Sequence, residues 1–533
     1  MTKADQPLPG LPLGISTFEA LRAQQTVYAD KTALVSELAE WPAQKIFLAR
    51  PRRFGKSLLS STFRSLFANN LRDFEGLDIA RTWKDKTYPV VYLDFSGLPQ
   101  FHDEEAFRRA LSSRLLSAFE GVGFRYDDAS RLSFFDQFRV WLAGLPLNSL
   151  VLIIDEYDAP LTALLNNEEA FTSARNILFE FYSRLKEGEG ALRFLFMTGI
   201  TKFNKASVFS SLNNLTDISL DPHFGSFLGL TEEELDRYFS PHLNRAAQTL
   251  GLSGKSDLIA KMAAMYDGFC FDRFAKTHVF NPWSVLKFLR SPEMGFINYW
   301  YDSGAEPTFL MNALSAKSLE APEAYLRPRY ADLSELVLPA DYETINPDVL
   351  LFQAGYLTIK QSDGESVEMG YPNTEVAKSI ANLVIRSVLS AESRMKSGTG
   401  LLKRSFEAGD VHAVMESLSR ALRMMDYKDN PVGNEAACRA YLQMLLLGAT
   451  LLTHVEVHNA EGRSDIEVFA GEWHWVFEIK FVEKNAEAAK ALDRALMQME
   501  SKHYGEDLSG LKLIQLGVVY SAEAKTIACW KRA

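Results

Sequence analysis

Short apolar runs alternate with helical patterns along the first 230 residues of the chain. After the first apolar run, KIFLAR, the sequence SLLSSTFRSLFANNL places apolar residues at helical spacing. Apolar runs that are separated by helix-length segments are typical of buried parallel strands. The pattern therefore predicts a doubly wound α/β domain over residues 14–230, after an N-terminal tail at residues 1–13. Its predicted strands are KIFLAR, YPVVYLDFS, SLVLIIDEYD and LRFLFMTGIT, at residues 45–50, 88–96, 149–158 and 192–201.

The hydrophobic pattern becomes mainly helical after residue 230. TEEELDRYF begins with a helix-start signal, because Thr231 can cap the helix and Glu234 follows three residues later. We expect a helical lid or accessory domain over residues 231–345. Residues 346–429 form a mixed region, in which the hairpin-like stretch GYLTIKQSDGESVEMGYP precedes amphipathic helices. Residues 430–533 are predicted to form another α/β domain, with the order helix, strands, helix, strand.

The composition, with 47% hydrophobic and 23% charged residues among 533, is that of a globular protein. MTKADQPLPG is polar and proline-rich, and no 18 consecutive residues are apolar, so neither a signal peptide nor a membrane span is expected. The three cysteines are too far apart to suggest a metal cluster or a disulfide framework. We therefore expect a cytoplasmic protein. The net charge of −11 argues against unspecific attraction to nucleic acid or to an anionic membrane.

RPRRFGKS, at residues 50–57, ends like a phosphate-binding loop but begins differently. The common loop has a glycine five residues before its second glycine, whereas here Arg50 stands five residues before Gly55. In such loops, backbone NH groups at a helix N-terminus surround phosphate oxygens, a lysine neutralises charge and a hydroxyl binds magnesium. Gly55, Lys56 and Ser57 are the candidates for these roles. Taken alone, GKS also occurs by chance.

The run VLIIDEYD supports a nucleotide site, because an acidic pair follows a buried strand there. Asp155 is placed to hold magnesium through water, and Glu156 is placed to polarise the attacking water. Thr198, Thr201 and Lys202 lie at the end of the next predicted strand, where they are placed to sense a γ-phosphate. Each of these groups is also common at a solvated strand end.

The arginines of the loop offer further donors for phosphate. Arg50, Arg52 and Arg53 are placed to bind phosphate, either in this chain or in a neighbouring subunit, and Arg53 is assigned to nucleotide binding. The alternative is that all three are solvated or paired with acidic groups. Because an arginine cannot adopt the positive φ of glycine without cost, Arg50 requires a different first turn of the loop.

EGRSDIEVFAGEWHWVFEIKF, at residues 461–481, predicts two strands that are joined around residues 470–472. Side chains alternate along a strand, so Glu478 and Lys480 share one face, and Asp465 can approach them across the hairpin. Two carboxylates can bind magnesium, which holds a scissile phosphate and lowers the pKa of the attacking water, while the lysine orients that water. Glu-x-Lys alone is a weak signal, since any solvent-facing strand can contain it.

Several longer motifs occur in order along the chain: LPLGISTFEALR, YADKT, RPRRFGKS, TGITKFNKASVFSSLNNLTDISLD, YDGFCF, FNPWSVLKFL and NYWYDSG. Together they closely resemble the bacterial AAA-ATPase-like proteins that end in a PD-(D/E)xK nuclease-like domain. The resemblance implies a P-loop AAA-like doubly wound parallel sheet, a helical accessory region and a C-terminal restriction-endonuclease-like α/β domain. It also implies that ATP and Mg²⁺ are the cofactors, and that Arg50 is a family feature of the loop.

The same resemblance assigns roles in the C-terminal domain. It transfers Glu435, Asp465, Glu478, Lys480 and, less directly, Gln498 as site residues. Asp465, Glu478 and Lys480 are the catalytic candidates, and Glu435 joins the two other carboxylates as a metal ligand. In the nucleotide site, Ser57 and Asp155 are the expected metal ligands.

Two functions fit these observations. The first is an ATP-regulated, metal-dependent nuclease that forms a homo-oligomer and acts on nucleic acid, with DNA favoured over RNA; the resemblance implies a role in defence or mobile elements. The second is a nucleotide-dependent switch or scaffold whose nuclease-like domain binds without cutting. Residues 431–533 contain 11 lysine and arginine against 14 aspartate and glutamate residues, a net charge of −3, which favours the second. The presence of Asp465, Glu478 and Lys480 favours the first.

Overall fold

The computed structural model describes most of the chain. The described residues divide into two compact units, and the main boundary between them falls between Asn373 and Thr374. The predicted hairpin after residue 354 therefore belongs to the first unit. The described ranges are 8–41, 44–98, 103–164, 167–202, 212, 214–300, 327–338, 346–388, 401–425, 432–449, 451–458, 463–505 and 510–533.

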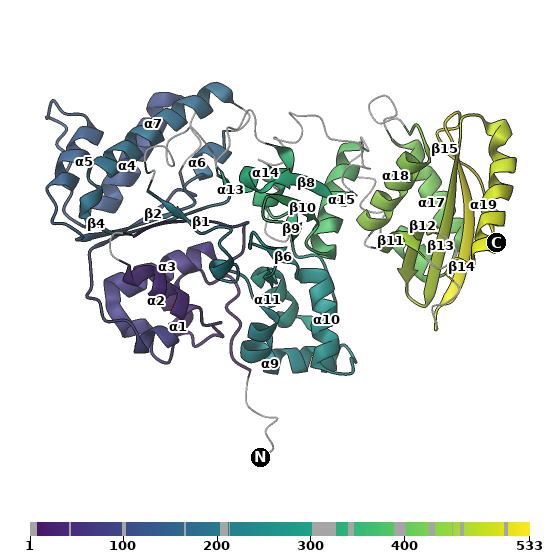
Figure 1. Ribbon diagram of the computed structural model, residues 1–533, viewed down its shortest axis with the longest axis horizontal. Helices are drawn as coiled ribbons and strands as arrows, with labels where there is room; N and C mark the ends of the chain where they lie inside the picture. The colour runs from purple at the N-terminus through teal and green to yellow at the C-terminus, as the bar shows by residue number, and fades with distance from the viewer. Residues whose placement is uncertain are drawn as a thin grey trace, which may run out of the picture. The chain divides into compact units, whose positions relative to one another are not determined.

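A five-stranded parallel sheet with the order β2-β3-β4-β1-β5 forms the centre of the first unit (Figure 1). Each of the four long strands lies in an apolar run that predicts it. The fifth strand has only two residues and no apolar pattern that announces it. Because β4 lies between β1 and β3, the loops that follow these strands meet at one edge of the sheet. The strands are β1 (Gln44–Ala49), β2 (Val90–Asp94), β3 (Leu150–Asp155), β4 (Leu192–Gly199) and β5 (Thr216–Asp217).

Helices cover both faces of this sheet, which confirms the doubly wound prediction. Figure 1 shows α4, α5 and α7 on one side of the sheet and α1, α2 and α3 on the other. Phe63 of α3 packs against Phe194 and Phe196 of β4, with ring centroids 5.0 and 4.7 Å apart. The helices are α1 (Phe18–Ala23), α2 (Thr32–Glu40), α3 (Lys56–Asn69), α4 (Glu104–Glu120), α5 (Phe134–Ala143), α6 (Ala159–Thr162) and α7 (Glu168–Glu187).

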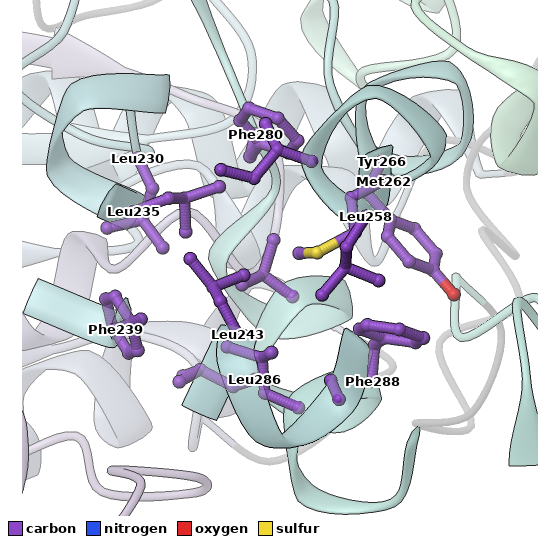
Figure 2. Close-up of a cluster of buried hydrophobic side chains, with 14 of the residues drawn as sticks. Leu230, Leu235, Phe239, Leu243, Leu258, Met262, Tyr266, Phe280, Leu286 and Phe288 are labelled. Atoms are coloured by element: carbon purple, nitrogen blue, oxygen red, sulfur yellow. The ribbon is translucent and has the colours of Figure 1, made fainter. Parts of the chain in front are cut away.

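Three helices, α9 (Glu232–Thr249), α10 (Lys255–Tyr266) and α11 (Pro282–Arg290), form a bundle in the first unit. The predicted start of α9 is confirmed, since Thr231 and Glu234 form a capping box. Figure 2 shows the core of the bundle, where Leu235, Leu243 and Met262 point toward one another from α9 and α10. Val27 of the N-terminal segment belongs to the same core, so this segment is held against the bundle.

A small antiparallel sheet with the order β8-β10-β9 completes the first unit. The predicted hairpin is confirmed by β9 and β10, and β8 adds a strand that the sequence pattern does not predict. Short elements surround it, and β6 pairs with β7. These elements are β6 (Phe269–Cys270), β7 (His278–Val279), β8 (Arg329–Asp332), α13 (Leu333–Val337), α14 (Pro347–Gln353), β9 (Thr358–Ser362) and β10 (Ser366–Gly370).

The second unit contains a mixed five-stranded sheet in sequence order, β11-β12-β13-β14-β15. Only β13 and β14 are parallel to each other, and α19 connects them. The predicted hairpin is confirmed by β12 and β13, which pair antiparallel. The elements are α15 (Thr374–Val388), α17 (Val411–Arg423), α18 (Glu435–Gly448), β11 (Leu452–His458), β12 (Arg463–Ala470), β13 (Trp473–Val482), α19 (Ala488–Lys502), β14 (Lys512–Ser521) and β15 (Thr526–Arg532).

Alternation along β13 fixes which face carries its charged residues. Val476 and Val482 pack against residues of α19 and the segment that follows it. Trp475 and Phe477, on the opposite face, pack against Phe406, with ring centroids 4.7 and 6.1 Å away. Side chains on one face of a strand are two residues apart. The charged residues at positions 478 and 480 therefore lie on the face that α19 covers.

Candidate functional site

The GKS sequence lies where a parallel strand passes into a helix. Gly55 is the N-cap of α3 and has a φ of 95°, a left-handed conformation that glycine adopts without strain. No side chain caps the first turn of this 14-residue helix. The NH groups of the turn, which begins at Lys56 and Ser57, are therefore available to an anionic ligand.

Lys56 is folded against its own loop. Its side chain is buried, and Nζ donates hydrogen bonds to the carbonyl oxygens of Arg50 and Pro51, at 2.9 and 3.0 Å. Burial lowers the pKa of Lys56, although the nearby carboxylates of Glu156, Asp155 and Asp158 act to raise it. The ammonium is thus positioned by the turn that precedes the helix.

Asp155 and Thr198 lie at the ends of neighbouring strands and contact each other. Both are buried, and Thr198 Oγ1 donates a short hydrogen bond to Asp155 Oδ1. Asp155 Oδ2 accepts a hydrogen bond of 2.9 Å from the hydroxyl of Tyr92 on β2. The two hydroxyl groups thus fix the orientation of this carboxylate.

Glu156 follows Asp155 in an uncommon backbone conformation, with a φ of 51°. Burial raises the pKa of Glu156, and Asp155 and Asp158 raise it further, while Lys56 acts in the opposite direction. Backbone strain at a non-glycine residue often accompanies a functional site, because the surrounding structure must enforce it. Arg53, with a φ of 71°, is a second such residue in the same area.

A cavity of about 530 Å³ opens over the GKS loop, and we call it the loop cavity. Lys56, Ser57 and Glu156 contribute its polar lining. Tyr28 of the N-terminal segment and Trp283 of α11 contribute aromatic surface. The volume is in the range of small-molecule sites, and an apolar wall beside a phosphate-type loop suits a nucleotide base. Asp155 and Thr198 are buried and are not among the residues that line this cavity.

In the second unit, Asp465 and Glu478 are brought together by the pairing of β12 and β13. Asp465 Oδ2 accepts a 2.7 Å hydrogen bond from the backbone NH of Ile479, and its Oδ1 accepts one of 3.1 Å from Arg439 on α18. Glu478 is 1% exposed. Burial raises the pKa of Glu478 to about 7, and the charge of Asp465 adds to this effect.

Lys480 links Glu478 to the start of α18. Lys480 Nζ donates a 2.6 Å hydrogen bond to Glu478 Oε1, and it lies 3.7 Å from Glu435 Oε1. Burial acts to lower the pKa of Lys480, but its bond to Glu478 and the neighbouring carboxylates raise it on balance. Burial raises the pKa of Glu435. The lysine and three acidic residues that the sequence singles out therefore lie within one charged cluster.

Comparisons with known proteins agree with both parts of this geometry. Residues 12–209 match the family described as predicted AAA-ATPase, and residues 434–530 match the PD-(D/E)XK nuclease superfamily. The chain joins an AAA-ATPase-like region to a PD-(D/E)XK nuclease-like region. The resemblance that the sequence motifs indicated is thereby confirmed on both segments.

One curated relative matches along nearly the whole length of the chain. An uncharacterized protein in the vnfD 5′ region of Azotobacter chroococcum mcd 1 is 28% identical over 531 residues, which cover 97% of each protein. Among solved structures, the ORC2 protein of Aeropyrum pernix, in ADPNP and ADP complexes, aligns with 84% of this chain and 90% of its own. That alignment has 12% identity and a TM-score of 0.27.

In the AAA-ATPase-like region, some polar residues do not take the positions expected from the sequence. Arg50 is 1% exposed and binds main-chain carbonyls, so it does not offer its guanidinium to a phosphate. Thr201 donates to the buried Asp158 at 2.6 Å, and Lys202 forms a buried ion pair with Asp217 at 2.7 Å. These interactions hold loops together behind the strands, because burial of such groups requires partners.

Arg53 leaves the loop toward the helical bundle. Its guanidinium lies over the ring of Trp283, 4.0 Å from the centroid, and both residues line the loop cavity. Trp283 belongs to the motif FNPWSVLKFL, to which the sequence pattern assigned no chemistry. A cation–π pair needs contact between distant segments, so spacing along the chain cannot reveal it.

The PD-(D/E)XK nuclease-like region has an acceptor that fits a divalent cation. Glu478 Oε2 is buried and has no hydrogen-bond partner among the described residues. An unpartnered buried carboxylate oxygen beside Asp465 is the type of ligand that hard cations prefer. Both oxygens of Asp465 and Oε1 of Glu478 already accept hydrogen bonds from the protein, and no group of three or more candidate metal ligands is found in the described chain.

Two further residues of the PD-(D/E)XK nuclease-like region, Arg439 and Gln498, make contacts that bear on the site. Arg439 was not predicted, although it contacts Asp465 from the helix that also carries Glu435. Gln498 donates to the hydroxyl of Tyr504 at 3.3 Å, so its amide is engaged within the α19 segment.

Within the described residues, no helix has both the length and the apolar character to cross a membrane.

Proposed function

We propose that this protein is an ATP-binding, metal-dependent nuclease in which the AAA-ATPase-like region controls the PD-(D/E)XK nuclease-like region. The observation that carries the nuclease part is Glu478, a buried carboxylate with one unpartnered oxygen beside Asp465 and Lys480. Keeping a carboxylate buried at this position is costly, which favours a role for its charge.

The proposed nucleotide site is the loop cavity. Gly55, Lys56 and Ser57 bind the phosphates through the helix N-terminus, the ammonium and the hydroxyl. Arg53, whose guanidinium lies against Trp283, closes the cavity over the nucleotide. Glu156 orients the attacking water. The apolar lining that Tyr28 and Trp283 provide accepts the base.

Ser57 and Asp155 are the residues that would hold a magnesium ion at the proposed nucleotide site, and Thr198 holds Asp155 in position. ATP binding is better supported than rapid hydrolysis, because burial and then the carboxylates of Asp155 and Asp158 raise the pKa of Glu156, which favours its protonated form.

In the proposed nuclease site, Asp465 and Glu478 would hold the divalent cation, and Glu435 would join them after a rearrangement, because the three carboxylates do not form a ready ligand group in the described chain. The cation would supply positive charge at the scissile phosphate. Lys480, released from Glu478, orients the attacking water or stabilises developing charge. Asp465 keeps its geometry through the backbone NH of Ile479, which remains a donor whatever occupies the other oxygen.

The proposed substrate and setting extend the family resemblance. We propose nucleic acid as the substrate, with DNA favoured over RNA, and a cytoplasmic homo-oligomer that takes part in defence or in mobile-element biology. The C-terminal residues are weakly acidic, so the rest of the protein or an assembly of several copies would have to recruit the substrate.

Purified protein incubated with plasmid DNA and with RNA, with and without Mg²⁺ and ATP, tests the proposal. We expect cleavage that needs the cation and falls by orders of magnitude in Asp465→Asn. Equal cleavage by wild type and Asp465→Asn would assign the activity to a contaminant, and absence of cleavage with every metal would refute the nuclease.

The second candidate is a nucleotide-dependent scaffold whose nuclease-like region only binds. The contact of Arg439 with Asp465 favours it, because a guanidinium on the carboxylate competes with a metal ion. On this hypothesis Asp465→Asn and Glu478→Gln keep full biological activity, whereas the nuclease hypothesis predicts its loss.

A further inference from the structure

Arg50 occupies the position where the common phosphate loop has glycine, yet its side chain is one of the largest fully buried groups in the described chain. Its Nη1 donates to the carbonyl oxygens of Ala49 and Ser219, at 2.9 and 2.6 Å. Its Nη2 donates to Phe224 O at 3.1 Å. Burial lowers the pKa of Arg50 to about 9, so the group stays charged at neutral pH. The guanidinium therefore joins the start of the loop to the segment that follows β5.

The flat face of the same guanidinium lies over Phe271, 4.3 Å from the ring centroid. Phe54, four residues later in the loop, packs edge-on against Phe269 and Phe271, with centroids 4.9 and 5.1 Å away. Phe269 and Phe271 belong to the sequence YDGFCF, which follows α10. Arg50 and Phe54 of the loop thus both contact the Phe269–Phe271 segment, which lies between the sheet and the helical bundle.

The backbone of Arg50 connects these contacts to Lys56. Arg50 N donates to Gly199 O at 3.1 Å, which attaches the residue to the end of β4. Arg50 O accepts one of the two hydrogen bonds of Lys56 Nζ. The direction of this carbonyl, and with it the position of the ammonium, depends on where the Arg50 side chain is anchored.

We propose that Arg50 is a positioning residue for the phosphates of the nucleotide. Its buried hydrogen bonds and its contact with Phe271 set the first turn of the loop. In the common phosphate loop, glycine sets this turn through its conformational freedom. The inference rests on the proposed nucleotide site and deepens it. The contact between Arg50 and Phe271 also connects the nucleotide phosphates to the Phe269–Phe271 segment, because a shift of the loop must move the Phe271 ring.

The test measures the affinities of the full-length protein for ATP and for AMP, with Mg²⁺, by calorimetry. Arg50→Gly restores the common motif, Arg50→Lys keeps the charge without the forked donors, and Phe271→Leu removes the ring. We expect ATP affinity to fall at least about tenfold in Arg50→Gly and by a smaller factor in the two other variants, while AMP affinity stays within twofold. Phe274→Leu, at an exposed phenylalanine nearby, serves as the matched control and is expected to match wild type.

Lys56→Ala in the same assay separates the inference from the function beneath it. If Lys56→Ala loses ATP and Arg50→Gly binds ATP as tightly as wild type, the positioning role is refuted while the nucleotide site stands. Equal loss of ATP and AMP would also refute it, since that result indicates general unfolding of the site. If wild type binds no nucleotide, both fall. Should Arg50→Gly fail to fold, unchanged ATP affinity in both Arg50→Lys and Phe271→Leu refutes the inference.

Discussion

Replacing Glu478 by glutamine should stabilise the metal-free protein at high pH while removing a ligand that the proposed nuclease needs. Burial, with the charge of Asp465, raises the pKa of Glu478 from 4.5 to about 7 in the folded protein. A raised carboxyl pKa means that the fold prefers the protonated form. The stabilisation that this form contributes is fully present below pH 4.5 and is lost as the pH rises through 7.

Each pKa unit corresponds to about 1.4 kcal/mol, so the full effect on the free energy of unfolding is on the order of 3 kcal/mol. Since glutamine does not titrate, the stability of Glu478→Gln relative to wild type should rise by about this amount between pH 4 and pH 8. The assay is urea unfolding in EDTA, with the β13 segment followed by hydrogen exchange to isolate the second unit.

The matched control for this experiment is Glu472→Gln, because Glu472 is an exposed carboxylate in the turn of the same hairpin. Its ion pair with Lys512 is exposed on both sides, so Glu472→Gln should change the free energy of unfolding by less than about 1 kcal/mol at either pH. A pH-independent difference for Glu478→Gln, or one that falls as the pH rises, would refute the assignment of Glu478 as a buried carboxylate held at a cost.

Three other predictions follow from the two candidate sites. Lys56→Ala should nearly abolish ATP binding, measured by calorimetry, while Glu156→Gln should keep ATP affinity and slow hydrolysis, measured as phosphate release. Arg439→Gln should tighten Mn²⁺ binding by roughly tenfold, measured by electron paramagnetic resonance, because it removes a positive charge next to Asp465; unchanged affinity would show that the arginine does not compete with the cation. ATP should promote self-association, and light scattering that gives the same mass with and without ATP would contradict this.

Much of the fold is predictable because its signals are local. The strands of the parallel sheet lie in mainly apolar runs, and β3 and β4 are buried along their entire length. The capping box at Thr231 is readable for the same reason, since its two partners are three residues apart. By contrast, β5 and β8 are short strands whose pairing depends on the rest of the sheet, and no pattern of their own reveals them.

The contacts in the candidate sites likewise divide into those that local spacing predicts and those that only the tertiary fold reveals. Glu478 and Lys480 share a face by alternation, so their contact is predictable from spacing alone. Arg439 lies 26 residues from Asp465, and the pairing of Arg53 with Trp283 spans far more chain, so only the tertiary fold reveals these contacts. Arg50 is the hardest case, because a charged residue in a loop normally indicates solvent exposure, whereas this one is buried by carbonyls and a ring.

In both candidate sites, the cationic side chains already have partners within the protein. Lys56 binds two carbonyls of its own loop, Arg439 binds Asp465, and Lys480 binds Glu478. A nucleotide or a divalent cation must therefore exchange these contacts for new ones, and only the difference in interaction free energy contributes to affinity. In the proposed nuclease site, this exchange would move the Lys480 ammonium away from the Glu478 carboxylate. A ligand of either proposed site can shift a conformational equilibrium only by its differential affinity for the two states, so the contacts that it replaces limit any control of one region by the other.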